Sequence, residues 1–160
     1  MKPLAAVLLS LLLLSGCDVN NAAPKIIADD PDTEQQQHQV FDATVAFLHL
    51  LDDGKADQTW SVASPLLKAS TSEFVWANGI KALRLGLGAY VERKSANIGF
   101  TSQMPGGPAG NYAVVECVTT FATGPATEKV VFREEGNQWR VVGYFVNKRI
   151  ILSGDSTETP

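Results

Sequence analysis

This 160-residue chain has only two histidines and two cysteines, so it has few nitrogen and sulfur ligands for a metal such as zinc and can form at most one internal disulfide. The histidines, His38 and His49, fall on one predicted helix about 16 Å apart, too far to share an ion. Basic stretches are also missing, since 13 lysines and arginines stand against 17 acidic residues and nowhere cluster. The sequence therefore indicates no metal site, no cofactor and no nucleic-acid partner.

The chain also lacks an apolar run long enough to cross a membrane, which takes about 20 residues. Its N-terminal run, Leu4–Leu14, has 11 residues and follows Met1-Lys2, an arrangement typical of a secretory signal. The end of that run, Leu14-Ser15-Gly16-Cys17, resembles the bacterial lipobox. This resemblance implies cleavage after Gly16 and acylation of Cys17. The alternative is an ordinary signal peptide that happens to contain a cysteine.

A lipid on Cys17 would hold the chain in the bacterial cell envelope, facing the periplasm. The next residue, Asp18, resembles the inner-membrane retention signal of enteric bacterial lipoproteins, which favours the inner over the outer membrane. Residues 17–33 lack apolar periodicity and indicate a flexible acidic tether. With Cys17 acylated, Cys117 has no partner for an intramolecular disulfide, and its place in a predicted strand favours a buried, inert thiol.

Three helices are predicted after the tether. An apolar stripe at helical spacing runs over Glu34–Leu51, and Gly54 is placed to end that helix. A short second helix is predicted over residues 56–63, where Ser64-Pro65 breaks the pattern. A third helix begins at Ser70 or Thr71 and ends at Gly86 and Gly88.

After Gly88 the apolar spacing becomes two, which is typical of strands. Four strands are predicted, over residues 90–100, 112–122, 127–134 and 139–146. Short connections make the last three an antiparallel meander, while the long loop over residues 101–111 either contacts a partner or is a proline-stiffened connection. Three N-terminal helices followed by four strands imply one α+β domain over residues 34–152, with the helices on one face of the sheet and a disordered tail at 153–160.

The two turns of the meander set the expected register of its strands. Pairing Thr123 with Ala126 and Glu134 with Trp139 places Cys117 on the face that the helices cover. The opposite face mixes valines with charged side chains and tyrosine. A slip by one residue would exchange the faces of a strand, so this assignment depends on the two turns.

On that opposite face, Glu116, Arg133 and Arg140 are expected to lie opposite one another, with Tyr144 beside them. A carboxylate between two guanidinium groups could bind an anionic ligand or act as an acid–base pair. The alternative is a cross-strand charge ladder, worth about 0.2 to 1 kcal/mol per pair. The interleaved valines suggest that a second subunit covers this face, which predicts weak homodimerisation.

Several motifs, in this order, resemble those of a bacterial family catalogued only as domain of unknown function 4019. They are Leu51-Asp52-Asp53-Gly54, Trp60-Ser61-Val62-Ala63-Ser64, Trp76, Arg84, Arg93, Met104-Pro105-Gly106 and Trp139-Arg140-Val141-Val142-Gly143-Tyr144-Phe145. The resemblance covers about residues 40–146. It implies a cystatin-like, nuclear-transport-factor-2-like cone of helices over a curved sheet, in secreted or lipid-anchored proteins, and brings no activity with it.

Four aromatic residues, Phe47, Trp60, Trp76 and Trp139, could line a pocket under the helices, as this kind of fold allows, or simply fill the core. An enzyme would need an acid or a histidine among them, and the expected core face offers only Glu134 at a strand end. The leading hypothesis is therefore a non-enzymatic, lipid-anchored module that binds an envelope protein, a second copy or a small ligand. The alternative is a small enzyme of the isomerase or dehydratase type that uses this pocket.

Overall fold

A five-stranded sheet and four helical segments make up residues 25–28 and 34–148, the part of the chain that the computed structural model describes. The helical segments are α1 (Glu34–Asp52), the 3-10 helix η1 (Gln58–Val62), α2 (Pro65–Ser70) and α3 (Glu73–Leu87). The strands are β1 (Lys25–Ala28), β2 (Tyr90–Thr101), β3 (Tyr112–Phe121), β4 (Gly124–Glu135) and β5 (Gln138–Lys148). The predicted signal peptide, Cys17 and the predicted tail lie outside the described residues.

Strands β2 to β5 form an antiparallel meander, which confirms an α+β fold with a four-stranded antiparallel sheet. Strand β1 adds a fifth strand parallel to β2, by pairing with residues 95–98. The prediction of a flexible tether is therefore wrong for Lys25–Ala28, and the helices do not all precede the sheet. The β-branched pair Ile26-Ile27 favours a strand, and the edge of β2 offers it unpaired backbone groups.

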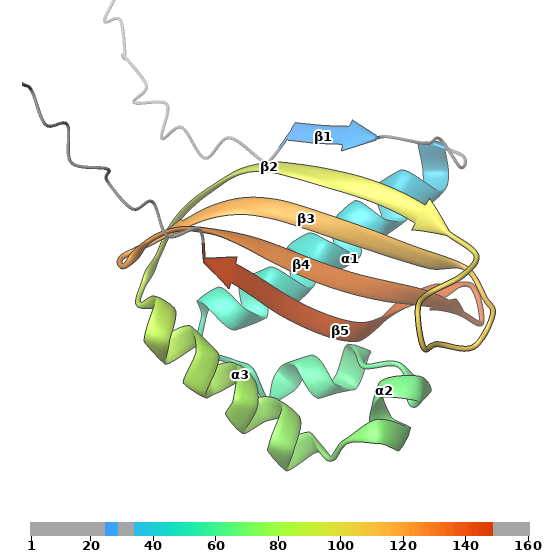
Figure 1. Ribbon diagram of the computed structural model, residues 1–160, viewed down its shortest axis with the longest axis horizontal. Coiled ribbons are helices and arrows are strands. Elements are labelled where there is room, and N and C mark those ends of the chain that lie inside the picture. Colours follow the sequence, from blue (N-terminus) through green and yellow to red (C-terminus); the bar gives the residue numbers. More distant parts are fainter. Residues whose placement is uncertain (1–24, 29–33, 149–160) are drawn as a thin grey trace, which may run out of the picture.

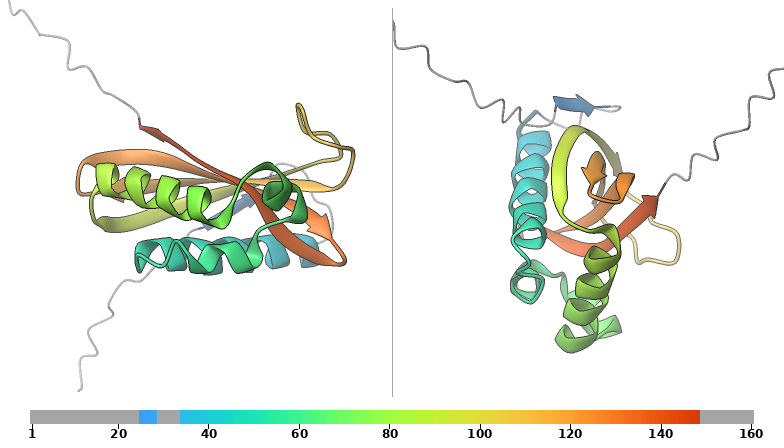
Figure 2. Two further views of the ribbon diagram at one scale, coloured as in Figure 1. Left: turned by 90° about the horizontal axis from the view of Figure 1, so that it is seen from below. Right: turned by 90° about the vertical axis from the view of Figure 1, so that its left-hand side faces the viewer.

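The helices and the sheet form two layers. Helix α1 crosses one face of the sheet, and α2 and α3 lie along the β5 side (Figure 1). The views in Figure 2 place no described helix against the opposite face. The main hydrophobic core lies between α1 and the sheet, where Phe47 and Leu51 of α1 join Val115 and Phe132. One face of the sheet is therefore covered, and we call the other the open face.

The segment around Ser64-Pro65 differs from the prediction. The predicted second helix is a 3-10 helix over Gln58–Val62, and it ends before Ser64-Pro65 as predicted. Ser64-Pro65 also begins helix α2, which was not predicted. The Ser64 hydroxyl oxygen accepts a hydrogen bond from the Leu66 N–H at 3.0 Å and donates one to Glu135 Oε1 at 2.6 Å. Serine at the N-cap and proline at the first helical position are both favourable, because proline has no N–H that needs a partner there.

The register between β3 and β4 also differs from the prediction. Phe121 pairs with Gly124, so the turn consists of two residues and Cys117 lies opposite Glu128 instead of Phe132. Gly124 has a φ of +114°, which glycine adopts without strain. The pairing is displaced by four residues, an even number, so β3 and β4 keep the faces that the sequence predicted.

The turn between β4 and β5 is as predicted, with Glu134 opposite Trp139. Its two residues, Gly136-Asn137, have φ values of +56° and +67°, as expected for a tight hairpin turn. Further along, Val142 has no partner on β4, which makes a bulge and shifts the rest of β5 by one residue. Tyr144 is therefore turned into the core and is only 8% exposed. The prediction that it lies on the open face is wrong.

Candidate functional site

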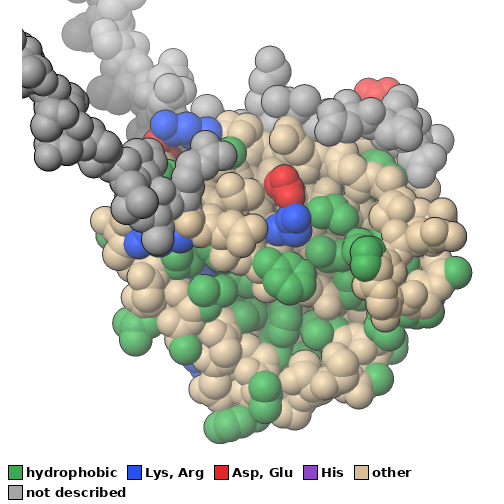
Figure 3. Space-filling model, viewed as in Figure 1, with side chains coloured by type: hydrophobic (Ala, Val, Ile, Leu, Met, Phe, Trp, Pro, Cys, Tyr) green, Lys and Arg blue, Asp and Glu red, His purple; other side chains and the backbone are tan. Residues whose placement is uncertain are grey.

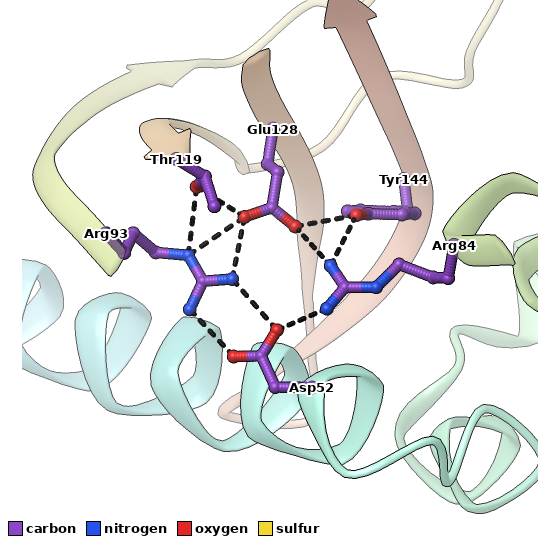
Figure 4. A network of polar contacts seen from close by, with 6 residues as sticks. All are labelled: Asp52, Arg84, Arg93, Thr119, Glu128 and Tyr144. Atoms are coloured by element: carbon purple, nitrogen blue, oxygen red, sulfur yellow. Dashed lines mark hydrogen bonds and ion pairs between the residues drawn. The ribbon is translucent and has the colours of Figure 1, made fainter. Parts of the chain in front are cut away.

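A carboxylate, that of Glu128 in β4, lies fully buried inside the core (Figure 4). Its Oε1 accepts from Arg84 Nη1 at 2.9 Å, and its Oε2 accepts from Arg93 Nη2 at 2.7 Å. The hydroxyls of Thr119 and Tyr144 donate to Oε2 and Oε1 at 2.5 and 2.6 Å. Donors from α3, β2, β3 and β5 thus occupy both oxygens of this carboxylate.

A second carboxylate, that of Asp52 at the end of α1, faces the same two arginines (Figure 4). Its Oδ2 accepts from Arg93 Nη1 at 3.0 Å, and its Oδ1 accepts from Arg84 Nη2. The side chains of Asp52, Arg84 and Arg93 are only 9% to 12% exposed. Two acids and two arginines therefore close a ring with no net charge. We call it the buried charge network, formed by Asp52, Arg84, Arg93 and Glu128 with the hydroxyls of Thr119 and Tyr144.

Aromatic rings support both arginines of the buried charge network. The guanidinium carbon of Arg84 lies 4.8 Å from the centre of the Phe121 ring, and that of Arg93 lies 4.8 Å from the centre of the Tyr90 ring. Glu128 reaches them because it occupies an inward position of β4, between buried residues of the same face. Ring faces attract cations, so each arginine has an aromatic contact besides its carboxylates.

The surroundings of Arg84, Arg93 and Tyr144 in the buried charge network favour the protonated form of each. Burial alone would lower the pKa of Arg93, but its hydrogen bonds with Asp52 and the charge of Glu128 raise that pKa above its ordinary value. For Arg84, hydrogen bonds with Tyr144 and Asp52 outweigh burial in the same way and raise its pKa. Burial and the charge of Glu128 raise the pKa of Tyr144. Both arginines therefore stay charged and Tyr144 stays a hydrogen-bond donor at neutral pH.

This arrangement is better suited to holding elements together than to chemistry. A general acid or base must come within hydrogen-bond reach of a reacting atom, but Glu128 is fully buried and both its oxygens are engaged. Taking charged groups out of water costs free energy, which their mutual pairing has to offset. The closed ring provides that pairing and, with the hydroxyls of Thr119 and Tyr144, joins α1 and α3 to four strands of the sheet, β2 to β5.

The sequence did not predict this network, although Asp52, Arg84 and Arg93 stand in motifs of the family resemblance. The expectation that Glu134 is the only acid toward the core is wrong. Strand β4 begins at Gly124, three residues earlier than predicted, so that Glu128 lies well inside it. The sequence did offer one signal for this network. Glu128 is an acid at an inward position of a strand, and a buried charge of this kind needs partners of opposite sign.

The four aromatic residues expected around one pocket are divided between different places. Phe47 and Trp139 are buried in the core. Trp60 and Trp76 are half-buried, and Trp76 donates from Nε1 to Thr59 Oγ1 at 2.8 Å. Of the four, only Trp139 lines the 240 Å³ pocket at the loop end of the sheet.

The structure separates the charged residues expected to lie together on the open face. Glu116 lies opposite Lys129 rather than Arg133, and Lys129 Nζ is 2.7 Å from Glu116 Oε1. Arg133 does lie opposite Arg140, as predicted, but its Nη1 pairs with Glu135 Oε1 at 3.2 Å. The displaced register between β3 and β4 is the reason, because it moves every partner across these strands by four residues.

Hydrophobic side chains gather on the open face around an acidic side chain that stands beside a basic one (Figure 3). Val118 and Phe145 on this face are 46% and 55% exposed. A side chain on Gly143 would collide with the ring of Phe145, since a Cβ there would lie 2.8 Å from it. We define the open-face patch as Val114, Glu116, Val118, Lys129, Val131, Val142 and Phe145.

Cys117 is buried on the core face, as predicted, and burial raises the pKa of its thiol to about 12. Because the thiolate is the reactive form, we expect Cys117 not to react with a thiol reagent at about pH 8 while the protein is folded. It should react once urea unfolds the chain. Mass spectrometry of the peptide that contains Cys117 measures this, and labelling in the folded protein would contradict it.

Residues 25–28 and 34–148 contain neither a metal-binding cluster nor a membrane-spanning helix. No group of three histidine, cysteine or acidic side chains in these ranges is placed to hold a metal ion. No helix within them is both long and apolar enough to span a membrane.

Comparison with known proteins gives a family but no activity. Two curated proteins of Lychas mucronatus, both named lipolysis-activating peptide 1-beta chain, are 38% identical to this chain over 63 residues, which is 39% of this chain and 67% of each relative. No solved structure matches. The family model described as "Protein of unknown function (DUF4019)" matches residues 43–144, which include every member of the buried charge network. The chain therefore belongs to the DUF4019 family.

Proposed function

We propose that this chain is a non-catalytic module of the bacterial cell envelope that binds a protein through its open face, with a second copy of itself as the partner. The observation that carries this proposal is the open-face patch, where exposed Val118 and Phe145 accompany the Glu116–Lys129 ion pair. Exposed apolar patches of this kind mark interaction surfaces. Binding is also favoured over catalysis because the buried carboxylates are fully engaged with arginines.

A second copy of the chain fits the patch because the patch carries both an acidic side chain, Glu116, and a basic one, Lys129. In a dimer with twofold symmetry the same patch meets itself, so Glu116 of each copy can face Lys129 of the other. The surrounding valines and Phe145 would exclude water from these contacts, and removing water strengthens charge pairs. One acid and one base at the middle of an apolar face therefore favour self-association over a partner of a single charge sign.

The envelope location depends on the N-terminal sequence. In this proposal the signal is cleaved after Gly16, Cys17 carries the lipid and Asp18 favours the inner membrane. Strand β1 begins at Lys25, eight residues after Cys17, and a chain of that length reaches at most about 26 Å at 3.3 Å per residue. Anchored copies held this close to one surface meet at a raised effective concentration, which supports a weak dimer.

For the finer fold we propose the cystatin-like, nuclear-transport-factor-2-like cone. The support is α1 packed across an antiparallel meander, with α2 and α3 beside it. The isomerase or dehydratase alternative has less support, since its acid would have to be Glu128 or Asp52, and both are bound to two arginines. Either acid would have to leave that network before it could accept a proton from a substrate.

Substituting Val118→Glu should prevent self-association, because it places a second acid beside Glu116 in the patch of each copy. Analytical ultracentrifugation of the full chain in detergent measures this. The unmodified protein should shift from monomer to dimer as its concentration rises, and V118E should stay monomeric. Leu85→Glu on α3 is the matched control, because Leu85 is 85% exposed but lies on a helix, and it should dimerise normally. Equal association of V118E and the unmodified protein would refute the proposal.

A further inference from the structure

A second candidate site lies where the long loop over residues 102–111 leaves the sheet. It is a pocket of 240 Å³ between the start of α1, the end of β2 and the starts of β3 and β5. This volume corresponds to about eight water molecules at 30 Å³ each, so the pocket can take only a compact molecule. The polar side chains that line it are Gln36, Thr101, Ser102 and Asn111, and the aromatic ones are Phe100, Tyr112 and Trp139.

Several polar groups of this pocket lack partners among the described residues. The indole nitrogen of Trp139 is buried and has no acceptor. No hydrogen bond joins the side chains of Gln36 and Ser102 to another described residue. Asn111 donates from Nδ2 to Glu134 Oε2 at 2.9 Å, which fixes its amide and leaves its carbonyl oxygen as an acceptor. A buried N–H without a partner is costly, so a ligand that accepts a hydrogen bond from the Trp139 indole would gain affinity.

The loop that carries part of this pocket is held in place before any ligand arrives. The Tyr112 hydroxyl donates to the Pro108 carbonyl oxygen at 2.6 Å, and Arg133 Nη2 donates to the Ala109 carbonyl oxygen at 3.3 Å. Gly110 permits this contact, because a Cβ there would lie 2.9 Å from Arg133 Nε. A loop fixed in this way spares the ligand the entropy cost of ordering it.

We infer that this pocket binds a small uncharged molecule rich in hydroxyl and amide groups, of the size of a monosaccharide. The described lining has hydroxyl, amide and indole groups but no acidic, basic or histidine side chain. A charged ligand would lose its hydration there without gaining an opposite charge. An uncharged sugar can both donate to the Asn111 carbonyl oxygen and accept from the Trp139 N–H. The site is separate from the open-face patch and does not depend on the dimer.

The test is an NMR titration of the full, ¹⁵N-labelled chain in detergent with glucose, N-acetylglucosamine, cationic glucosamine and anionic glucuronate. The two uncharged sugars should shift the Trp139 indole resonance in a saturable way, whereas the charged sugars should not. The Trp76 indole is an internal control, because it already donates to Thr59 and should stay in place. If neither uncharged sugar shifts Trp139, or if the charged sugars shift it equally, the inference is wrong.

A pair of loop variants locates the site. Ser102→Leu fills the pocket and should weaken the binding of the uncharged sugars roughly tenfold or more. Gln103→Leu makes the same kind of change at the neighbouring exposed position, which does not line the pocket, and should leave binding unchanged. Equal binding by S102L and Q103L would place the sugar elsewhere and overturn the inference.

Discussion

Replacing Glu128 by glutamine is expected to lower the free energy of unfolding by about 3 to 5 kcal/mol, the usual cost of removing one partner from a buried ion pair. Glu128 is fully buried and receives Arg84 and Arg93 on its two oxygens. Glutamine has a similar shape but no charge, so both arginines would share Asp52 alone. Its amide group would also turn a donor toward guanidinium donors.

Urea denaturation of the purified chain measures this loss, with Glu116→Gln as the matched control. Glu116 belongs to a half-exposed pair with Lys129, so its substitution should cost no more than about 1 kcal/mol. Equal losses in the two variants would show that the buried charge network does not hold the fold. Because domains are stable by only about 5 to 15 kcal/mol, E128Q could fail to fold, and that outcome also supports the prediction if E116Q folds.

Tyr144→Phe gives a graded version of the same test. It keeps the ring that packs at 5.7 Å against Phe47 and removes only the hydroxyl that donates to Glu128. Losing a hydrogen bond to a charged group typically costs about 1.5 to 3 kcal/mol. In urea denaturation, the free energy of unfolding of Y144F should lie between those of the unmodified protein and E128Q. An unchanged free energy of unfolding would contradict a stabilising role for the buried charge network.

Helices and turns that depend only on residues close together in the chain could be predicted from the sequence. The stripe over Glu34–Leu51 predicted α1 to within one residue, because apolar spacing and the following glycine are read directly from the sequence. The turn at Gly136-Asn137 was predicted for a similar reason, since both residues tolerate positive φ. Helix α2 was missed, because Ser64-Pro65 marks the end of the preceding helix and also begins the next one.

Features that depend on contacts between distant residues could not be predicted in this way. Strand β1 exists because an edge of β2 lies beside it, and that edge is about 70 residues away in the chain. The bulge at Val142 turned Tyr144 into the core, and a bulge leaves no local sequence signal. The buried charge network depends on the extent of β4 and on the packing of α1 and α3. The sequence therefore showed Asp52, Arg84 and Arg93 as motif residues but not that they meet Glu128.

The second large effect concerns the dimer. Glu116→Lys would place four lysines at the twofold axis, two from each copy, and Lys129→Glu would place four acids there. Like charges that face each other across an interface cost several kcal/mol, so each variant should self-associate at least about tenfold more weakly. Both residues are partly exposed within the monomer, with side-chain exposures of 44% and 34%, so the fold itself should be little affected.

Mixing the two variants restores the charge pairing only if the copies meet through this face. The lysine introduced in the E116K chain would then lie against the glutamate introduced in the K129E chain, and the unchanged Lys129 of the first chain would lie against the unchanged Glu116 of the second. Co-expression of the full E116K chain with one affinity tag and the full K129E chain with another, followed by purification on one tag, measures this directly. The account predicts that each variant fails to recover its own kind and that the two recover each other. Recovery of E116K by E116K as well as by K129E, or no recovery in the mixture while the unmodified chains recover each other, would contradict it.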